Sequence, residues 1–279
     1  MRRALSTIFE LLRLSRAVNS LALALLFIAA LRHFGGNFTV LNCLRATSWL
    51  LVALISYGYN DVLDVEIDMR NRPRRPIPLG TISRTQATIW VVFLTLCSAV
   101  VTVYAWGRTA FWPILGLAGS ILYSRVIRSR SALFANVVAA LLVTIVAASA
   151  ELNPHKAGAL FFNAFLFCLM VAREFQKDVM DAPGDIGFRR LGVLVEASPI
   201  LGRVIYVSLL IASCALLVLF TNSESHNGLF HLLWLSCLGI LLTAVVRFLS
   251  GLGGAREQML LTKSAAYVTI ALLIAGVRQ

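Results

Sequence analysis

The chain has little charge. Only 14% of its 279 residues are Asp, Glu, Lys or Arg, whereas a soluble domain carries about 25%. Hydrophobic residues make up 59% of the chain, and the mean hydropathy is +0.82. No stretch is polar enough to form a second, soluble domain, so residues 1–279 are interpreted as a single integral-membrane domain.

The chain also lacks the spacings that mark several common sites. Its five cysteines contain no C-x-x-C pair and are expected to be packing residues. No Walker or Rossmann glycine pattern is present, and Ser/His/Asp catalysis has no support. The histidines are scattered, without metal-ligand spacing, and receive no role: His33, His155, His226 and His231.

What the chain does have is a series of long apolar runs. Most are long enough to cross a hydrocarbon core of about 30 Å as helices. They predict an all-α polytopic membrane protein with about nine spans. The predicted spans cover residues 14–34, 44–60, 86–106, 110–124, 132–150, 157–174, 198–220, 229–249 and 263–278.

Basic residues are distributed unevenly among the predicted loops. The net charge is +12, but a nucleic-acid-binding protein would carry this excess as a stripe on a polar domain. Most of the 25 Lys and Arg residues instead fall in the loops on one side of the predicted membrane. The positive-inside rule therefore predicts a multi-pass protein of the cell membrane with its N-terminus in the cytoplasm.

The acidic residues gather in two short stretches. Asp61, Asp64 and Asp68 form the first motif, directly after Asn60. Because positions i, i+3 and i+7 share one face of a helix, we expect these three carboxylates on one face of an extended second helix. Clustered carboxylates repel one another unless a cation joins them. Oxygen ligands of this kind suit Mg2+, and the Asn60 amide oxygen could complete the shell.

Arginines follow the first motif within a proline-rich loop, Asn71 to Gly80. Guanidinium groups suit bidentate contact with phosphate, so Arg72 and Arg75 are candidate diphosphate ligands. A solvated acidic helix end followed by ordinary positive-inside arginines is the alternative. It does not account for three like charges on one face at a membrane boundary.

The second motif repeats the acidic spacing, with Asp178, Asp181 and Asp185. Pro183-Gly184 predicts that the helix ends there and that Asp185 follows in a turn. Lys177 either contacts a diphosphate or forms a local ion pair. Four predicted helices separate the two motifs, which suggests two similar four-helix halves plus a ninth helix, with both motifs facing the cytoplasm. Two carboxylate clusters suggest two Mg2+ ions and a bound diphosphate.

These motifs resemble those of the UbiA-type intramembrane prenyltransferases over essentially the whole chain. N-D-x-x-D-x-x-x-D followed by N-x-P-x-R-P-I-P-x-G is similar to the branch that contains geranylgeranylglyceryl phosphate geranylgeranyltransferases and chlorophyll synthases. R-E-x-x-K-D-x-x-D-x-x-G-D looks most like the archaeal-lipid part of that branch. Three positions depart from the family pattern: the stretch after Asp185, Ala135 before Asn136, and Arg128 where Lys is common.

The resemblance implies roles for further residues. The six Asp residues would be catalytic through the Mg2+ ions they bind, and Arg128 would join Arg72, Arg75 and Lys177 at the diphosphate. The candidate acceptor-binding residues are Arg16, Asn19 and Tyr123, together with Arg189 and Arg190, whose guanidinium groups remain for an acceptor phosphate after the diphosphate is bound.

The predicted function is Mg2+-dependent transfer of a prenyl group from a polyprenyl diphosphate to a lipophilic acceptor in the membrane. An isoprenyl glycerol phosphate is one possible acceptor. Two alternatives stay open: a UbiA-type terpene cyclase acting on the same diphosphate, and a membrane transporter. The expected partners are the prenyl diphosphate, the acceptor and membrane lipid, and no nucleic acid.

Overall fold

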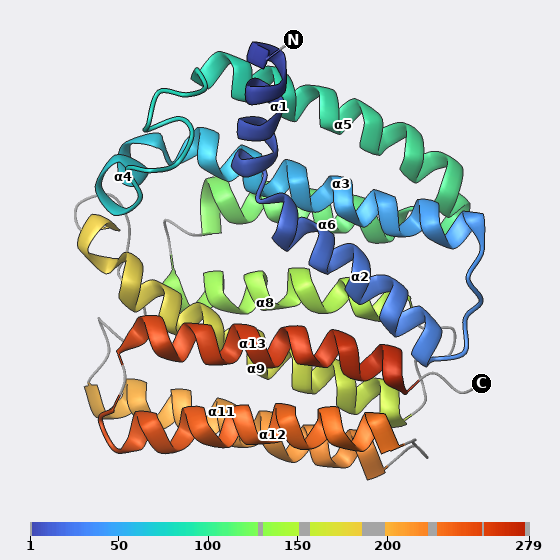
Figure 1. Ribbon diagram of the computed structural model, residues 1–279, viewed down its shortest axis with the longest axis vertical. Helices are drawn as coiled ribbons and strands as arrows, with labels where there is room; N and C mark the ends of the chain where they lie inside the picture. Colours follow the sequence, from blue (N-terminus) through green and yellow to red (C-terminus); the bar gives the residue numbers. More distant parts are fainter. Residues whose placement is uncertain are drawn as a thin grey trace. The chain divides into compact units, whose positions relative to one another are not determined.

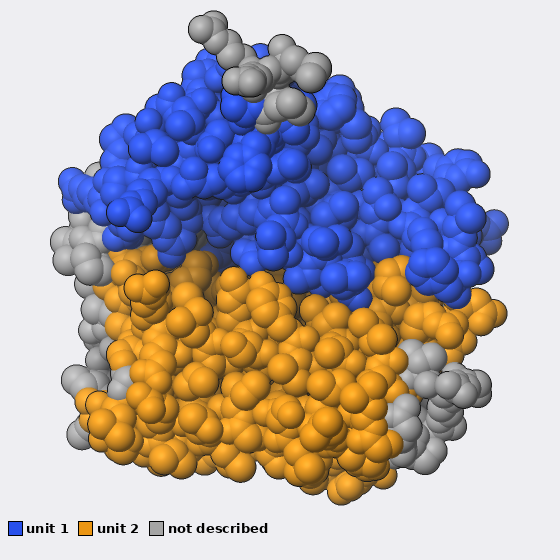
Figure 2. Space-filling model, in the orientation of Figure 1, with its two compact units in different colours: residues 1–25, 38–130, 183–189 blue, residues 26–37, 131–182, 190–279 orange. Residues whose placement is uncertain are grey.

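The computed structural model describes residues 2–127, 131–150, 157–185, 199–222, 228–252 and 254–276. Every regular element in these ranges is a helix, as Figure 1 shows. The chain divides into two compact units, coloured separately in Figure 2. Unit 1 contains residues 1–25, 38–130 and 183–189, and unit 2 contains residues 26–37, 131–182 and 190–279.

Unit 1 is built around α3 (Val40–Leu63), which packs against α5 (Arg84–Trp106) and α6 (Phe111–Leu122). Leu54 and Ile55 of α3 are buried against Val91 and Leu94 of α5. The two helices approach closely at Gly58, where a Cβ atom would lie 3.1 Å from the Val91 side chain. This contact fixes the end of α3 that leads into the first Asp motif.

The remaining elements of unit 1 surround this pair. They are α1 (Arg2–Leu14), the first half of α2 (Ala17–His33), α4 (Val65–Asn71), the 3-10 turn η1 (Gly107–Thr109) and the π-helical turn η2 (Tyr123–Ile127). The indole Nε1 of Trp90 on α5 donates to the hydroxyl of Ser15, 2.9 Å away. This bond ties the junction of α1 and α2 to α5.

Unit 2 contains α8 (Ala132–Ala148), α9 (Ala157–Asp185), α11 (Pro199–Asn222), α12 (Gly228–Leu249) and α13 (Ala255–Ala275). Helix α12 packs against both α11 and α13. The core of unit 2 contains several fully buried aromatic side chains, including Phe162, Phe220 and Phe230. Tyr206 on α11 is also fully buried, and its hydroxyl lies 3.2 Å from Oε1 of Gln258 on α13.

In the described residues, the nine apolar segments predicted from the sequence fall mainly on helices, but the count of nine spans is not established. In the described residues, six helices are long and apolar enough to cross a membrane, and a bent pair of helices would make a seventh. Phe111–Ile127 and Ala132–Ala148 are apolar but shorter. The six are Val40–Leu63, Arg84–Thr109, Ala157–Ala182, Leu201–Asn222, Gly228–Leu249 and Ala255–Ala275.

The first predicted span is corrected by the structure. Residues 14–34 do not form one helix, because α1 ends at Leu14 and α2 begins at Ala17 with a bend of 59°. Arg16 lies in the break with a φ of 48°, in the left-handed region that non-glycine residues rarely adopt. The Ser20 hydroxyl donates to the Ser15 carbonyl across the break, 3.0 Å away.

Two predictions about the motif helices were wrong. The first motif is not on one continuous helix, because α3 ends at Leu63 and Asp64 separates it from α4. Conversely, α9 does not end at Pro183-Gly184 but continues to Asp185. A proline removes one backbone donor and strains the preceding turn, yet here it does not stop the helix.

Candidate active site at the Asp motifs

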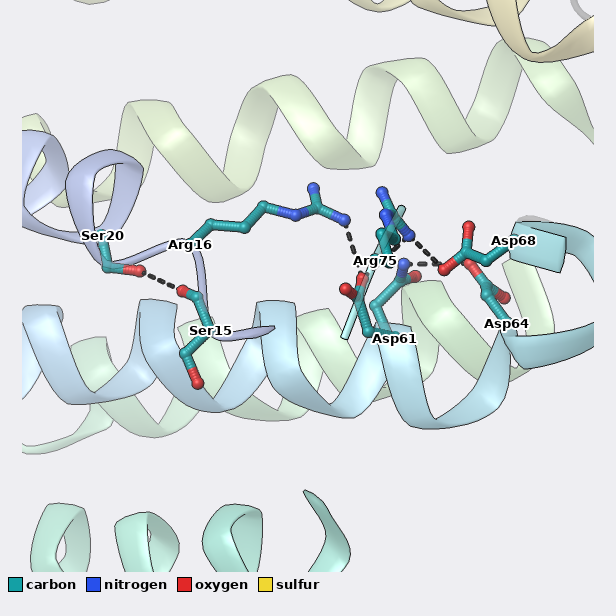
Figure 3. A network of polar contacts seen from close by, with 8 residues as sticks. Ser15, Arg16, Ser20, Asp61, Asp64, Asp68 and Arg75 are labelled. Carbon is teal, nitrogen blue, oxygen red and sulfur yellow. Dashed lines mark hydrogen bonds and ion pairs between the residues drawn. The ribbon is translucent and has the colours of Figure 1, made fainter. Parts of the chain in front are cut away.

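The first motif is organised by Arg75, which lies between two of its carboxylates (Figure 3). Its Nη1 donates to Oδ1 of Asp61 at 2.9 Å and also forms an ion pair with Asp68. Asp61 comes from α3 and Asp68 from α4, while Arg75 comes from the loop beyond α4. The guanidinium therefore pairs with carboxylates on both sides of Asp64, the residue between α3 and α4.

Arg16 is the second cation of this network. Its Nη2 donates to the same Oδ1 of Asp61 at 2.8 Å, and its guanidinium lies 4.8 Å from the centre of the Tyr57 ring. Figure 3 shows the Arg16 side chain extending from the break between α1 and α2 to Asp61. One carboxylate oxygen thus accepts hydrogen bonds from two arginines.

All three carboxylates of the first motif are buried. Asp61, Asp64 and Asp68 are 3%, 4% and 4% exposed, and buried charges of like sign repel strongly unless cations pair with them. Burial raises the pKa of Asp68, and the neighbouring Arg75 guanidinium partly offsets this rise. Burial lowers the pKa of Arg75, with the nearby Arg16 charge acting in the same direction.

The oxygen donors of the first motif suit Mg2+ by their chemistry. The Asn60 amide donates through Nδ2 to Oδ2 of Asp64 at 2.9 Å. Within the part of the chain that the structure describes, however, no three His, Cys, Asp or Glu side chains converge as a metal cage. In proteins Mg2+ commonly retains several waters and is bound by carboxylates together with substrate phosphates.

Other predicted residues of unit 1 lie around this motif. Arg72 caps the C-terminal end of α4, where its N–H donates to the Asp68 carbonyl at 2.8 Å. The N–H of Asn19 donates to the Arg16 carbonyl in the first turn of α2. Tyr123 opens the π-helical turn η2 and is partly buried.

Sequence reasoning gave no role to Arg125, which contacts a residue beside the first motif. The Arg125 Nε donates to the hydroxyl of Tyr59, and the Arg125 guanidinium stands 5.6 Å from the Tyr59 ring centre. Tyr59 directly precedes Asn60. The π-helical turn that carries Arg125 has no clear sequence signal, so the pairing could not be predicted from spacing.

The second motif lies near the end of α9. The Asn136 amide of α8 donates through Nδ2 to Oδ2 of Asp178 at 2.9 Å, and Asp181 is 5% exposed. Sequence reasoning named Asn136 only as the residue after Ala135, the position that departs from the family pattern, and gave Asn136 no site role. This hydrogen bond orients one oxygen of Asp178.

Glu174 lies one helical turn before Asp178 and is 5% exposed. Its two oxygens accept from Arg173 and from Lys177, each at 2.7 Å. The local ion pair considered for Lys177 is therefore formed. Several predicted site groups lie outside the described residues: Arg128, Arg189, Arg190 and the side chain of Asp185.

Sequence comparison connects these motifs with known proteins. A family model described as the UbiA prenyltransferase family matches residues 20–272. A digeranylgeranylglyceryl phosphate synthase of Thermococcus kodakarensis is 30% identical over 228 residues, covering 78% of this chain and 79% of that protein. The enzyme of that name from Halobacterium salinarum is 33% identical over 192 residues, covering 66% and 68%.

Solved structures of similar fold agree with the family match. A digeranylgeranylglyceryl phosphate synthase superposes with a TM-score of 0.72 at 17% identity, covering 99% of both chains. A UbiA homologue from Archaeoglobus fulgidus bound to GPP and Mg2+ gives a TM-score of 0.72 at 15% identity, covering 96% of this chain and 99% of that one. At these identities the likeness establishes the fold.

Proposed function

Since the chain belongs to the UbiA prenyltransferase family, we propose that it transfers a prenyl group to an isoprenyl glycerol phosphate in the membrane. The protein is an integral membrane prenyltransferase, and the reaction depends on Mg2+. The choice of acceptor is supported by the relatives named digeranylgeranylglyceryl phosphate synthase. The motif that carries the proposal is the buried set of carboxylates and arginines around Asp61.

The carboxylates of both motifs are the proposed Mg2+ ligands: Asp61, Asp64, Asp68, Asp178, Asp181 and Asp185, with the Asn60 amide oxygen. Bound Mg2+ supplies positive charge that stabilises the diphosphate as it leaves. The burial of Asp61, Asp64 and Asp68 supports this role, because buried clusters of carboxylates need cations. In a relative of the same fold, GPP and Mg2+ are bound together.

Cationic side chains add to this stabilisation. As the allylic C–O bond breaks, negative charge grows on the diphosphate, and fixed positive groups bind that charge more strongly than they bind the intact substrate. Arg75 and Arg72 lie close to the first motif and Lys177 beside the second. We assign these three, with Arg128, to the diphosphate. The hydrocarbon environment excludes water from the allylic cation.

The acceptor carries one phosphate, for which Arg189 and Arg190 are the proposed ligands, with Asn19 and Tyr123 near the acceptor. Its hydroxyl oxygen forms the new C–O bond to the prenyl group and loses its proton. The products are therefore a prenyl ether and free diphosphate. We further propose that both motifs face the cytoplasm, since most basic loop residues fall on the motif side of the predicted spans.

Product analysis tests this function. Purified protein is incubated with labelled geranylgeranyl diphosphate, Mg2+ and geranylgeranylglyceryl phosphate, and the lipid products are separated. We expect an ether that forms only when the acceptor is present and disappears in EDTA. Release of a terpene hydrocarbon at a rate that the acceptor does not change would instead identify a cyclase.

Variants of the two motifs provide the second part of the test. Asp61→Asn and Asp178→Asn are each expected to lower kcat at least about a hundredfold, as expected for loss of one preorganised electrostatic contact in the transition state. Arg247→Ala is the matched control. Arg247 pairs with Glu257 on a partly exposed surface, 2.6 Å away, and its loss should leave turnover near that of the parent.

A further inference from the structure

Asp61 has an unusual set of partners for a proposed metal ligand. A single oxygen, Oδ1, accepts from Arg16 at 2.8 Å and from Arg75 at 2.9 Å. The Asp61 side chain is 4% exposed, so water screens these charges little. A metal that binds Asp61 therefore either coordinates the other oxygen, Oδ2, of a carboxylate already paired with two guanidinium groups, or displaces one of them from Oδ1.

The local charge balance makes this competition strong. The carboxylates of Asp61, Asp64 and Asp68 carry three negative charges, and Arg16 and Arg75 carry two positive charges. These five side chains therefore carry one net negative charge, and the nearby Arg72 adds a further positive charge. A divalent cation added alone makes the group net positive and is repelled by guanidinium groups that water screens little. A divalent cation that arrives with a diphosphate brings its own negative charge and offsets this repulsion.

The backbone of Arg16 indicates that its position is specifically maintained. Its φ of 48° makes it the one non-glycine residue with a positive φ among the described residues. Such strain persists only where the surrounding structure holds it. Here the strained residue lies in the break between α1 and α2, and the Tyr57 ring lies 4.8 Å from its guanidinium. Strain and packing together aim the guanidinium at Asp61.

We propose that Arg16 is a counter-cation of the first Asp motif that opposes binding of the divalent metal alone and favours its binding together with a diphosphate. This role rests on the proposed function, because it assumes that Asp61 binds the metal. It differs from the acceptor-binding role that the family resemblance implies for Arg16. Arg16 is in this view a positioning residue, which acts through Asp61 and not on the acceptor.

The test measures metal binding directly, without turnover. Mn2+ replaces Mg2+ as a spectroscopic probe, and paramagnetic resonance of free Mn2+ gives its Kd for purified protein in detergent. In Arg16→Gln we expect Mn2+ alone to bind at least about tenfold more tightly. The free energy of this tenfold change in Kd is a small part of the Coulomb repulsion between a divalent cation and a guanidinium about 5 Å apart, at an effective dielectric constant of about 20.

The same variant should respond in the opposite direction to a diphosphate. With Mn2+ saturating, an unreactive thiolodiphosphate analogue of the prenyl substrate should bind Arg16→Gln about tenfold more weakly, since one cation is lost. Arg16→Lys retains the charge and should restore both affinities toward those of the parent. Arg247→Ala removes the same charge elsewhere and should change neither.

An unchanged or weaker affinity of Arg16→Gln for Mn2+ alone would overturn the inference, because a merely structural arginine gives that result. If Arg16→Gln fails to fold, Arg16→Gly removes the same charge and suits the left-handed backbone. The proposed function fails separately. It is refuted if Asp61→Asn leaves Mn2+ binding intact and the parent forms product in EDTA, whatever Arg16 does.

Discussion

Replacing Arg75 by Gln is expected to destabilise unit 1 strongly, because this guanidinium is shared by two buried carboxylates. The side chains of Arg75, Asp61 and Asp68 are 13%, 4% and 6% exposed. Removing one partner of a buried ion pair costs about 3–5 kcal/mol. Arg16 still pairs with Asp61 in the variant, so we expect the lower end of this range, about 3 kcal/mol.

A double-mutant cycle isolates the Arg75–Asp68 pair. Asp68→Asn, Arg75→Gln and the double variant are unfolded reversibly with SDS in mixed micelles, in EDTA, and followed by circular dichroism. We expect a coupling free energy of about 2 kcal/mol, within the range measured for residues in one buried network. If the two single effects add to within about 0.5 kcal/mol, the ion pair does not stabilise the fold and the reasoning is refuted.

The pH dependence of this effect has a definite sign. Burial raises the pKa of Asp68, and Arg75 opposes that rise, so the pKa of Asp68 is higher still in Arg75→Gln. As the pH falls from neutral toward the ordinary range of Asp, the folded variant protonates Asp68 before the unfolded chain does, and this protonation stabilises the fold. The stability difference between parent and variant should therefore shrink at acid pH and be largest at neutral pH.

Three further predictions concern other parts of the chain. Asn136→Ala removes the hydrogen bond to Asp178 and should lower kcat/KM about tenfold, the effect of losing about 1.4 kcal/mol; unchanged steady-state kinetics would contradict a role in orienting Asp178. Gly58→Val places side-chain atoms where a Cβ alone already meets α5 at 3.1 Å. Overpacking of this kind costs about 1–3 kcal/mol, and a thermal midpoint equal to that of the parent would exclude the close approach. Cysteines introduced at Arg74 and Asn222 should react with impermeant reagents from opposite sides of the membrane; labelling of both from the cytoplasm would refute the proposed topology.

The helical fold could be predicted because the apolar runs dominate the sequence. The length of an apolar run predicts a helix directly, and in the described residues each predicted run falls mainly on helix, the first of them across the break between α1 and α2. The ends of the helices could not be predicted as well. Asp64 separates α3 from α4 although the i, i+3, i+7 spacing is ideal for one helix. The ion pairs of Asp61 and Asp68 with Arg75 are tertiary contacts that this spacing does not encode.

The candidate site was predicted in its residue types but not in its contacts. The clustering of Asp in a chain with few charges was sufficient to select Asp61, Asp64 and Asp68. Nothing in the spacing indicated that Arg16, 45 positions before Asp61, would reach it through a left-handed residue. Pro183 is the opposite case, because the sequence predicts a helix end there and α9 instead continues through it to Asp185.

The two short apolar helices have a consequence for the surrounding bilayer. Phe111–Ile127 and Ala132–Ala148 each contain 17 residues, which as α-helix extend about 25 Å, short of a hydrocarbon core of about 30 Å. A short span is accommodated by local thinning of the bilayer, at a fraction of a kcal/mol per Å. Where a helix this short crosses the bilayer, the polar headgroups approach the middle of the membrane, which shortens the distance over which a charged phosphate must be drawn into hydrocarbon. We therefore expect the acyl-chain length of the host membrane to affect how readily lipid substrates enter.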